Sequence, residues 1–216
     1  MRVVAGSAKG RRLLAPKGPG TRPVMDRVKT ALFDILAGEV VGGRFLDLFA
    51  GTGGIGIEAL SRGAETATFI ELEPEALRYV RRNLETTGLA ARAETIRADA
   101  FTFLEDAQAA GRRYDIVYVA PPQYQGMAAR AVAQLDAAPL TEPGRLVIAQ
   151  IHPRERGELD ALGLGRLRRY DERRYGSTLL LFYEHGDEHA NEGGDQSTQS
   201  DEAHLSRPDE GEAHST

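Results

Sequence analysis

Residues 44–60, RFLDLFAGTGGIGIEAL, decide the fold of this 216-residue chain. The mostly apolar run Phe45–Phe49 is typical of a buried strand, and it ends in the glycine-rich turn 51–56, GTGGIG. A helical pattern follows at once, so the stretch predicts a strand, a tight turn and the start of a helix. Because the first N–H groups of such a helix have no partner within it, the turn is also a candidate ligand site.

Asp47, near the end of this strand, indicates the kind of ligand. The Gly-x-Gly-x-x-Gly pattern alone also fits a dinucleotide site and occurs by chance in glycine-rich chains. A carboxylate beside the turn would repel a pyrophosphate but can pair with an ammonium group. S-adenosylmethionine (SAM) has a cationic amino-acid end and no phosphate. A nucleotide site and a purely structural turn remain the alternatives.

The spacing of the aspartate and the glycines resembles motif I of class I SAM-dependent methyltransferases. The resemblance implies SAM as cofactor and the following residues as its contacts on this segment: Asp47, Gly51, Thr52, Gly53 and Gly56.

Composition bounds the remaining possibilities. The chain has no cysteine, which excludes disulfides, thiolate metal sites and cysteine nucleophiles. No apolar run approaches the roughly 20 residues of a membrane helix, and the first residues lack the apolar segment of a secretion signal. The histidines after residue 186 are too scattered to predict a metal site. We therefore expect a cytoplasmic protein without a metal. We also expect a monomer.

Charge is distributed unevenly along the chain. Residues 1–29 hold eight basic residues and one acidic residue, whereas residues 186–216 hold nine acidic residues and one basic residue. A basic N-terminal segment is what contact with a phosphate backbone needs, although a solvated basic surface is the simpler interpretation. The last segment has a single large aliphatic residue, Leu205, so we expect a disordered acidic tail.

Strand and helix patterns alternate through the middle of the chain. Helical spacing is expected over 24–36, with Arg27 and Lys29 on its polar face, and over 74–87, 100–109, 127–135 and 154–162. Strands are expected at 45–49, 66–72, 91–98, 114–119 and 145–151, followed by a closing hairpin of 165–174 and 178–184. This order predicts an α/β fold with a seven-stranded, mostly parallel, Rossmann-like sheet. Two short strands, 2–5 and 11–14, predict an N-terminal β-hairpin.

The segments 6–13, GSAKGRRL, and 21–36, TRPVMDRVKTALFDIL, resemble the N-terminal region of the RsmD family of bacterial 16S ribosomal RNA guanine-N2 methyltransferases. The resemblance covers residues 1–185. It divides the chain into a basic hairpin extension (1–22), a methyltransferase domain (23–185) and the tail (186–216). It also implies 16S rRNA or the small ribosomal subunit as partner, with these RNA contacts: Lys9, Arg11, Arg12, Arg22 and Arg27.

Acidic residues follow two further strands. Ligands of open parallel sheets bind beyond the carboxyl ends of the strands, where Glu71 and Asp99 stand. Glu71 can accept both ribose hydroxyls of an adenosine, although Glu73 lies close enough to take this role. The family's acidic residue at Asp99 contacts the adenine amino group; an aspartate there is equally expected as a helix N-cap, and one residue could serve both purposes.

The strand 114–119 ends in Ala120-Pro121-Pro122-Gln123-Tyr124. Amino-methyltransferases carry Asn or Asp, two prolines and an aromatic residue here, so the loop is the candidate catalytic segment. Ala120 replaces the usual side-chain acceptor for the substrate amine, and Gln123 precedes the aromatic residue. The Pro121 carbonyl remains as an acceptor, Tyr124 can stack on a flipped base, and Gln123 is the candidate replacement oxygen.

The leading hypothesis is therefore methyl transfer to the exocyclic amine of a guanine in small-subunit rRNA. Its alternatives are a catalytically impaired SAM-binding factor for RNA or ribosome assembly, and an amino-methyltransferase acting on DNA or protein. An NAD-dependent oxidoreductase is disfavoured by Asp47 and by the lack of a candidate for proton transfer.

Overall fold

The structure, a computed structural model, describes residues 1–16 and 26–186. The predicted RNA contact Arg22, the predicted start of the first helix at residue 24, and the predicted tail beyond Gly186 lie outside these residues. In the described part, no helix has both the length and the apolar character needed to cross a bilayer.

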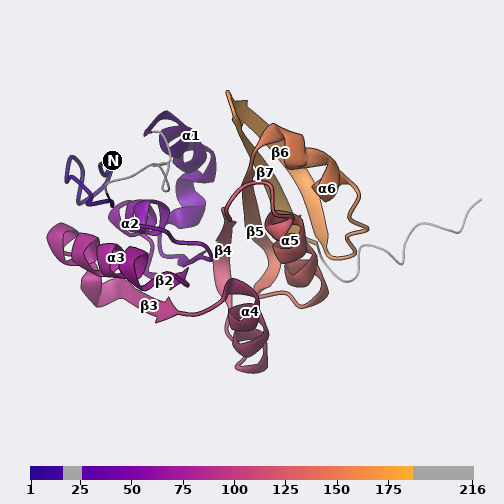
Figure 1. Cartoon of the computed structure of the whole chain (residues 1–216), viewed down its shortest axis with the longest axis horizontal. Helices are drawn as coiled ribbons and strands as arrows, with labels where there is room; N and C mark the ends of the chain where they lie inside the picture. Colours follow the sequence, from indigo (N-terminus) through magenta and orange to yellow (C-terminus); the bar gives the residue numbers. More distant parts are fainter. Residues whose placement is uncertain (17–25, 187–216) are drawn as a thin grey trace, which may run out of the picture.

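Seven strands of the described chain form one sheet in the order β3-β2-β1-β4-β5-β7-β6 (Figure 1). Their bounds are β1 Arg44–Asp47, β2 Thr66–Glu71, β3 Ala93–Arg97, β4 Tyr114–Val119, β5 Thr141–Ile151, β6 Leu167–Tyr175 and β7 Thr178–His185. Strands β1 to β5 run parallel to one another, and β7 pairs antiparallel with both β5 and β6. The predicted mostly parallel sheet and its closing hairpin are confirmed.

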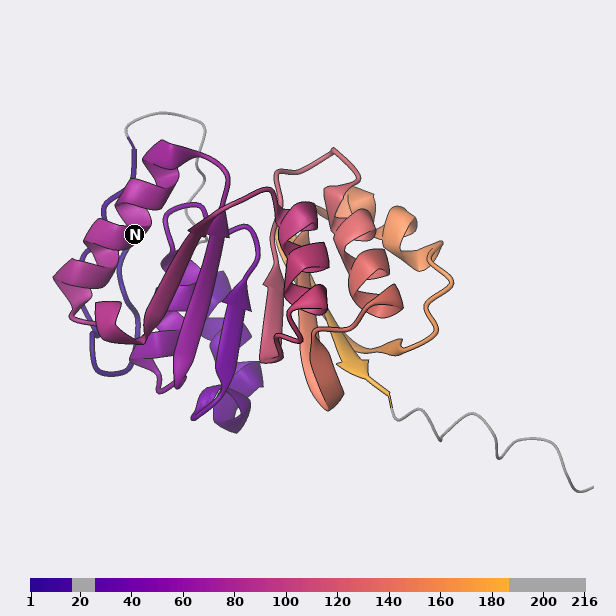
Figure 2. The same cartoon turned by 90° about the horizontal axis from the view of Figure 1, so that it is seen from below.

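Helices cover both faces of the sheet and enclose two cores (Figure 2). One face carries α1 Asp26–Leu36, α2 Gly54–Ser61 and α3 Pro74–Thr87, and the other carries α4 Ala100–Ala109, α5 Met127–Ala137 and α6 Arg156–Asp160. Short 3-10 turns are η1 Ala37–Val40, η2 Ala90–Arg92 and η3 Pro153–Glu155. Because both faces are buried, the central strands are nearly continuous apolar runs.

Local sequence signals explain several element ends. Pro74 starts α3, where its missing N–H costs nothing, and Gly88 ends it in the left-handed conformation at φ +73°. Most predicted element ends agree with the structure to within two residues, and the two clearest differences concern β5 and α6. β5 begins at Thr141, earlier than expected, because Tyr114 of β4 extends the pairing to it across a register shift. The helix expected over 154–162 is divided into η3 and the shorter α6, since Pro153 first sets a 3-10 turn capped by His152.

The N-terminal arm, residues 1–14, is packed onto the body of the protein. Its hairpin pairing is present, but it has one β-bridge, between Arg2 and Arg12, instead of the expected strands. The tight turn between them takes up most of the residues, and Gly6 in it (φ +79°) lies so close to Ser61 of α2 that a Cβ would come within 1.8 Å of the Ser61 carbonyl oxygen. Val3, Ala8 and Leu13 are buried in the core shared with α1 and α2.

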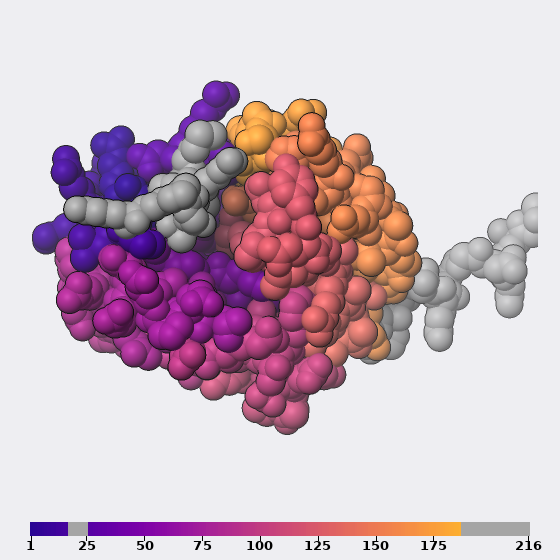
Figure 3. All heavy atoms as spheres, in the orientation of Figure 1, coloured from indigo at the N-terminus to yellow at the C-terminus, as the bar shows by residue number. Residues whose placement is uncertain are grey.

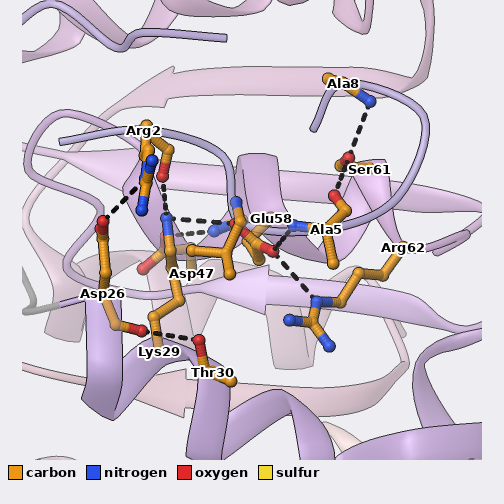
Figure 4. A network of polar contacts seen from close by, with 12 residues as sticks. Arg2, Ala5, Ala8, Asp26, Lys29, Thr30, Asp47, Glu58, Ser61 and Arg62 are labelled. Carbon is orange, nitrogen blue, oxygen red and sulfur yellow. Dashed lines mark hydrogen bonds and ion pairs between the residues drawn. The ribbon is translucent and has the colours of Figure 1, made fainter. Parts of the chain in front are cut away.

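A buried ion pair anchors this arm (Figure 4). The Lys29 ammonium lies 3.1 Å from the Glu58 carboxylate, both side chains are 0% exposed, and Lys29 also donates to the Arg2 carbonyl oxygen. Glu58 accepts hydrogen bonds from the Val4 and Ala5 N–H groups at 2.8 and 2.9 Å. The expectation that Lys29 lies on the polar face of its helix is wrong: its position is turned inward, and the arm covers it.

Candidate active site

A cavity of about 850 Å³ opens at the carboxyl ends of the parallel strands. In the space-filling view, the surface is hollowed between the violet N-terminal half and the salmon-coloured loop after β4 (Figure 3). Most of the predicted site residues, from the glycine turn, the strand-end acids and the Pro-Pro loop, line this one cavity: Asp47, Gly51, Thr52, Glu71, Asp99, Ala120, Pro121, Pro122, Gln123 and Tyr124. The fold thus joins the glycine turn and the Pro-Pro loop, which are about 70 residues apart in the sequence.

Asp47 ends β1 as a buried carboxylate, 2% exposed, at the wall of the cavity. Its Oδ2 accepts a hydrogen bond from the Gly56 N–H at 3.0 Å. Burial raises the pKa of Asp47 to about 7; the Gly56 N–H opposes this rise, and the nearby Glu71 carboxylate adds to it. A cation entering the cavity would relieve the cost of burying this charge.

Glu71 fixes the glycine turn as well as facing the cavity. Its two carboxylate oxygens accept the Gly51 N–H at 2.7 Å and the Glu73 N–H at 2.9 Å. Each oxygen keeps a further lone pair for a ligand hydroxyl. On the other side of the turn, the Asn83 side chain donates to the Thr52 carbonyl oxygen at 3.0 Å.

Gly53 and Gly56 do not line the cavity, although both belong to the motif. Gly53 is the N-cap of α2 with φ +82°, a conformation that strongly favours glycine. A Cβ at Gly56 would come within 2.4 Å of the Phe69 ring of β2. These two glycines therefore let the chain turn and let the helix approach the sheet.

Asp99 is the N-cap of α4. Its Oδ1 accepts the Phe101 and Thr102 N–H groups at 3.0 and 3.1 Å. The other carboxylate oxygen, Oδ2, makes no hydrogen bond within the described residues, and Asp99 lines the cavity. The geometry is compatible with both roles weighed from the sequence.

The Pro-Pro loop holds Tyr124 in an unusual backbone conformation. Tyr124 has φ +64°, in the left-handed region that disfavours side chains, and its side chain is 57% exposed at the cavity. The buried Glu155 carboxylate stabilises this turn by accepting the Tyr124 N–H at 2.8 Å and the His152 N–H at 2.9 Å. The Tyr124 and His152 rings are 5.2 Å apart.

Sequence reasoning missed Glu155, His152, Asn83 and the pair formed by Tyr118 and Gln150. The Tyr118 hydroxyl donates to Gln150 Oε1 at 2.6 Å, and both residues line the cavity. Tyr118 lies inside an apolar strand and resembles an ordinary core residue. Gln150 could have been noticed as a polar residue near the carboxyl end of a buried strand, where ligands of such sheets bind.

Four of the five predicted RNA contacts can be placed. Lys9, Arg11 and Arg12 lie on the arm and Arg27 on α1, and all four are exposed. None of them makes an ion pair within the part of the chain that the structure describes. Met1 and Ala15, near the two ends of the arm, line the cavity, so the arm adjoins the site directly.

Comparison with known proteins assigns the family. A family model described as conserved hypothetical protein 95 matches residues 1–184. Ribosomal RNA small subunit methyltransferase D of Escherichia coli is 38% identical over 136 residues, covering 63% of this chain and 67% of that protein. The Haemophilus influenzae protein of the same name is 34% identical over 151 residues, covering 69% and 78%. The chain belongs to this family, the RsmD family of methyltransferases.

A solved structure shows the same fold. A Thermus thermophilus protein, described as hypothetical, matches this RsmD-family chain with a TM-score of 0.71 and 34% identity, covering 85% of this chain and 99% of its own. The predictions of a class I methyltransferase fold and of a methyltransferase are confirmed. SAM is the methyl donor of that class, so the methyltransferase relatives also support the predicted cofactor.

The residues around the cavity suit SAM on chemical grounds. Asp47 offers a buried carboxylate to an ammonium group, Glu71 keeps lone pairs for ribose hydroxyls, and Asp99 keeps one oxygen for an amino group. The Asp47 and Glu71 carboxylates beside the glycine turn would repel the negative charge of a pyrophosphate.

Glu155 gives a first test of how this RsmD-family chain positions its loop. Glu155→Gln replaces one acceptor oxygen by an amide that faces an N–H donor, so we expect a loss of about 1–3 kcal/mol in the free energy of unfolding and, once Tyr124 loosens, a kcat lowered about tenfold. The affinity for SAM should change less than about twofold, because Glu155 does not line the cavity.

Denaturant unfolding, steady-state methyl transfer and SAM titration measure these three quantities. Glu158→Gln, an exposed neighbour on α6, is the control. An unchanged kcat in a destabilised Glu155→Gln variant would show that Glu155 serves stability alone.

Proposed function

We propose that the protein transfers a methyl group from SAM to the exocyclic N2 amine of a guanine in 16S rRNA. One observation carries the proposal: a single cavity is lined both by a carboxylate suited to a cationic cofactor and by a Pro-Pro-aromatic loop suited to an amine. Family membership supports the reaction class, and the relatives' names supply the kind of RNA.

The cofactor would be held by the turn and the strand-end acids. In this proposal Asp47 pairs with its amino group, Glu71 accepts its ribose hydroxyls and Asp99 accepts its adenine amino group. The backbone of Gly51 and Thr52 lies against it, and Gly53 and Gly56 keep that backbone in place. When bound, SAM would supply an electrophilic methyl group and keep the electron pair of the broken C–S bond as a neutral thioether. The amine that receives the methyl group would release one proton to water.

The loop would orient the substrate amine. A guanine N2 lone pair is delocalised into the ring, and hydrogen-bond acceptors on its N–H groups help it to become nucleophilic. The Pro121 carbonyl is one such acceptor, and the rings of Pro121 and Pro122 restrict the backbone that carries it. Tyr124, exposed at the cavity, can stack on a flipped base, which is worth roughly 1–3 kcal/mol.

The exposed basic residues would hold the RNA backbone. Lys9, Arg11, Arg12 and Arg27 have no competing ion pairs in the described chain, and Arg22 belongs to the same basic segment. Replacing one of these residues by a neutral one should reduce the slope of log K against log salt by about 0.7–0.9. We also propose that the enzyme works as a monomer, in the cytoplasm where ribosomal subunits assemble.

Transfer of tritiated methyl groups to small subunits from cells lacking the protein tests this proposal. We expect label at a single guanine, mapped by nuclease digestion and mass spectrometry as N2-methylguanine. SAM binding without transfer would favour the alternative of a SAM-binding assembly factor. Ala120 is the observation behind this alternative, because it lacks the usual acceptor for the substrate amine. Label on DNA adenine or on protein glutamine, but not on the subunit, would favour the remaining alternatives.

A further inference from the structure

Ala120 and Gln150 come together at the edge of the sheet. In the parallel register of β4 and β5, Val119 pairs with Ala149, so the next residue of each chain segment is Ala120 beside Gln150. Neighbouring strands lie about 4.8 Å apart, and paired residues of parallel strands point to the same face. Both residues line the cavity. The Gln150 side chain thus lies next to Ala120, the position where the usual acceptor is missing.

The Gln150 amide is held in place by Tyr118, which lies two residues before Ala120 on the same face. The Tyr118 hydroxyl donates to Gln150 Oε1 at 2.6 Å. Burial, followed by the negative charge of Asp47, raises the pKa of Tyr118 well above its ordinary value, so the hydroxyl keeps its proton and stays a donor. The Gln150 oxygen is therefore oriented and retains a second lone pair.

The Gln150 Nε2 group makes no hydrogen bond within the described residues, although the side chain is only partly exposed. A polar group at a cavity wall with capacity left on both its oxygen and its nitrogen is suited to a polar ligand. Gln123, in contrast, is exposed on the turn beyond the prolines and has no hydrogen bond from its side chain in the described chain. A fixed acceptor stabilises developing charge better than a mobile one, because it needs no reorganisation.

We propose that Gln150 Oε1 is the second acceptor for the exocyclic amine of the substrate, replacing the side chain that Ala120 lacks. This inference rests on the proposed methyl transfer and names the residue that completes it. One N–H of the amine bonds to the Pro121 carbonyl and the other to Gln150. Tyr118 acts as a positioning residue that aims the amide.

The test compares two variants that leave no buried hydroxyl unpaired. Tyr118→Phe removes the donor and keeps Gln150; Tyr118→Phe/Gln150→Leu also removes the amide at nearly constant shape. We expect Tyr118→Phe to lose part of the wild-type kcat, because nothing then aims the amide. The double variant should lose more, to about 10²-fold below the wild type, the loss typical of removing one preorganised hydrogen bond. SAM affinity should agree within about twofold between the two, which shows that the double variant is folded and holds its cofactor.

Adding Ala120→Asp to the double variant should raise its kcat at least about tenfold, because aspartate returns a carboxylate acceptor to position 120. Gln134→Leu is the matched control: Gln134 is a partly buried glutamine bonded to the Phe101 carbonyl oxygen and lies outside the cavity. Its kcat should match that of the wild type.

Two results would overturn the inference while leaving the proposed function intact. One is a double variant as fast as Tyr118→Phe. The other is a loss of kcat matched by an equal loss of SAM affinity, which would make Gln150 a structural partner of Tyr118 only. If the wild-type protein itself transfers no methyl group to small subunits, the proposed function fails, and the role of Gln150 fails with it.

Discussion

Asp47→Asn is expected to bind SAM at least about 100-fold more weakly than the wild type and, at pH 8, to be more stable against unfolding. The binding loss follows from removing one member of a buried pair of opposite charges. Asparagine keeps the size of the side chain and an oxygen for the Gly56 N–H, so the fold should persist. Buried charged residues that serve a binding site often lower the stability of the ligand-free protein.

The sign of the stability change follows from the raised pKa of Asp47. The folded protein holds this proton up to about pH 7, whereas the unfolded chain releases it near 3.8. Stability is therefore lost as the pH rises between these two values, and it stays reduced above pH 7. Asparagine does not titrate, so it removes a cost of about 2–4 kcal/mol at pH 8.

Thermal unfolding at pH 5 and pH 8, without SAM, measures the effect. The control is Asp115→Asn. Burial tends to raise the pKa of Asp115, but the Arg44 N–H and guanidinium and the Arg145 guanidinium outweigh it and lower that pKa. Asp115→Asn should therefore lose stability at pH 8. An Asp47→Asn variant that loses as much stability at pH 8 as Asp115→Asn would contradict the raised pKa of Asp47.

Lys29→Met should lower the free energy of unfolding by about 3 kcal/mol, because it leaves the fully buried Glu58 carboxylate without its ammonium partner. Methionine keeps the length and most of the packing. The Arg2 carbonyl oxygen also loses its donor, so the arm should detach before the rest of the molecule unfolds. The Arg62 guanidinium, 3.0 Å from Glu58, remains and limits the loss.

Denaturant unfolding and hydrogen exchange of residues 1–14 measure this change. Lys29→Met/Glu58→Gln should recover part of the stability, since residue 58 is then neutral and Arg62 keeps its ion pair with Asp34 at 3.5 Å. Lys9→Met, on the exposed part of the same arm, should leave stability unchanged. Equal stability of Lys29→Met and the wild type would mean that the ion pair does not anchor the arm.

Much of the fold could be predicted because its signals are local. Tyr114–Val119 and Ala100–Ala109 have the predicted bounds, since an apolar run and an aspartate cap define them without distant contacts. Lys29 was placed wrongly because its burial depends on an arm 27 residues away that supplies the Arg2 carbonyl oxygen. A helical pattern shows which face of a helix is polar, but it does not show what covers that face.

The residues of the candidate site likewise divide into those that local motifs predict and those that depend on distant contacts. Asp47 and the Pro-Pro loop could be found from their motifs, and the sheet topology then implied that they meet at one edge. Glu155 could not be found in this way, because it acts through the backbone of Tyr124. Gln150 could be noticed as a polar residue near a strand end, but its place beside Ala120 depends on the register between two strands, which no local pattern reports.

Isothermal titration of the wild-type protein with SAM, across about pH 5.5–7.5 and in two buffers of different ionisation enthalpy, tests the central claim most directly. Over this range an α-amino group, which titrates near 7.7–8.0, stays largely charged. We predict that the affinity rises about 20-fold with pH and that binding releases a proton near pH 6, because the cofactor's ammonium group must displace the proton of Asp47. Binding that is independent of pH and of buffer, or no binding of SAM at all, would contradict the account.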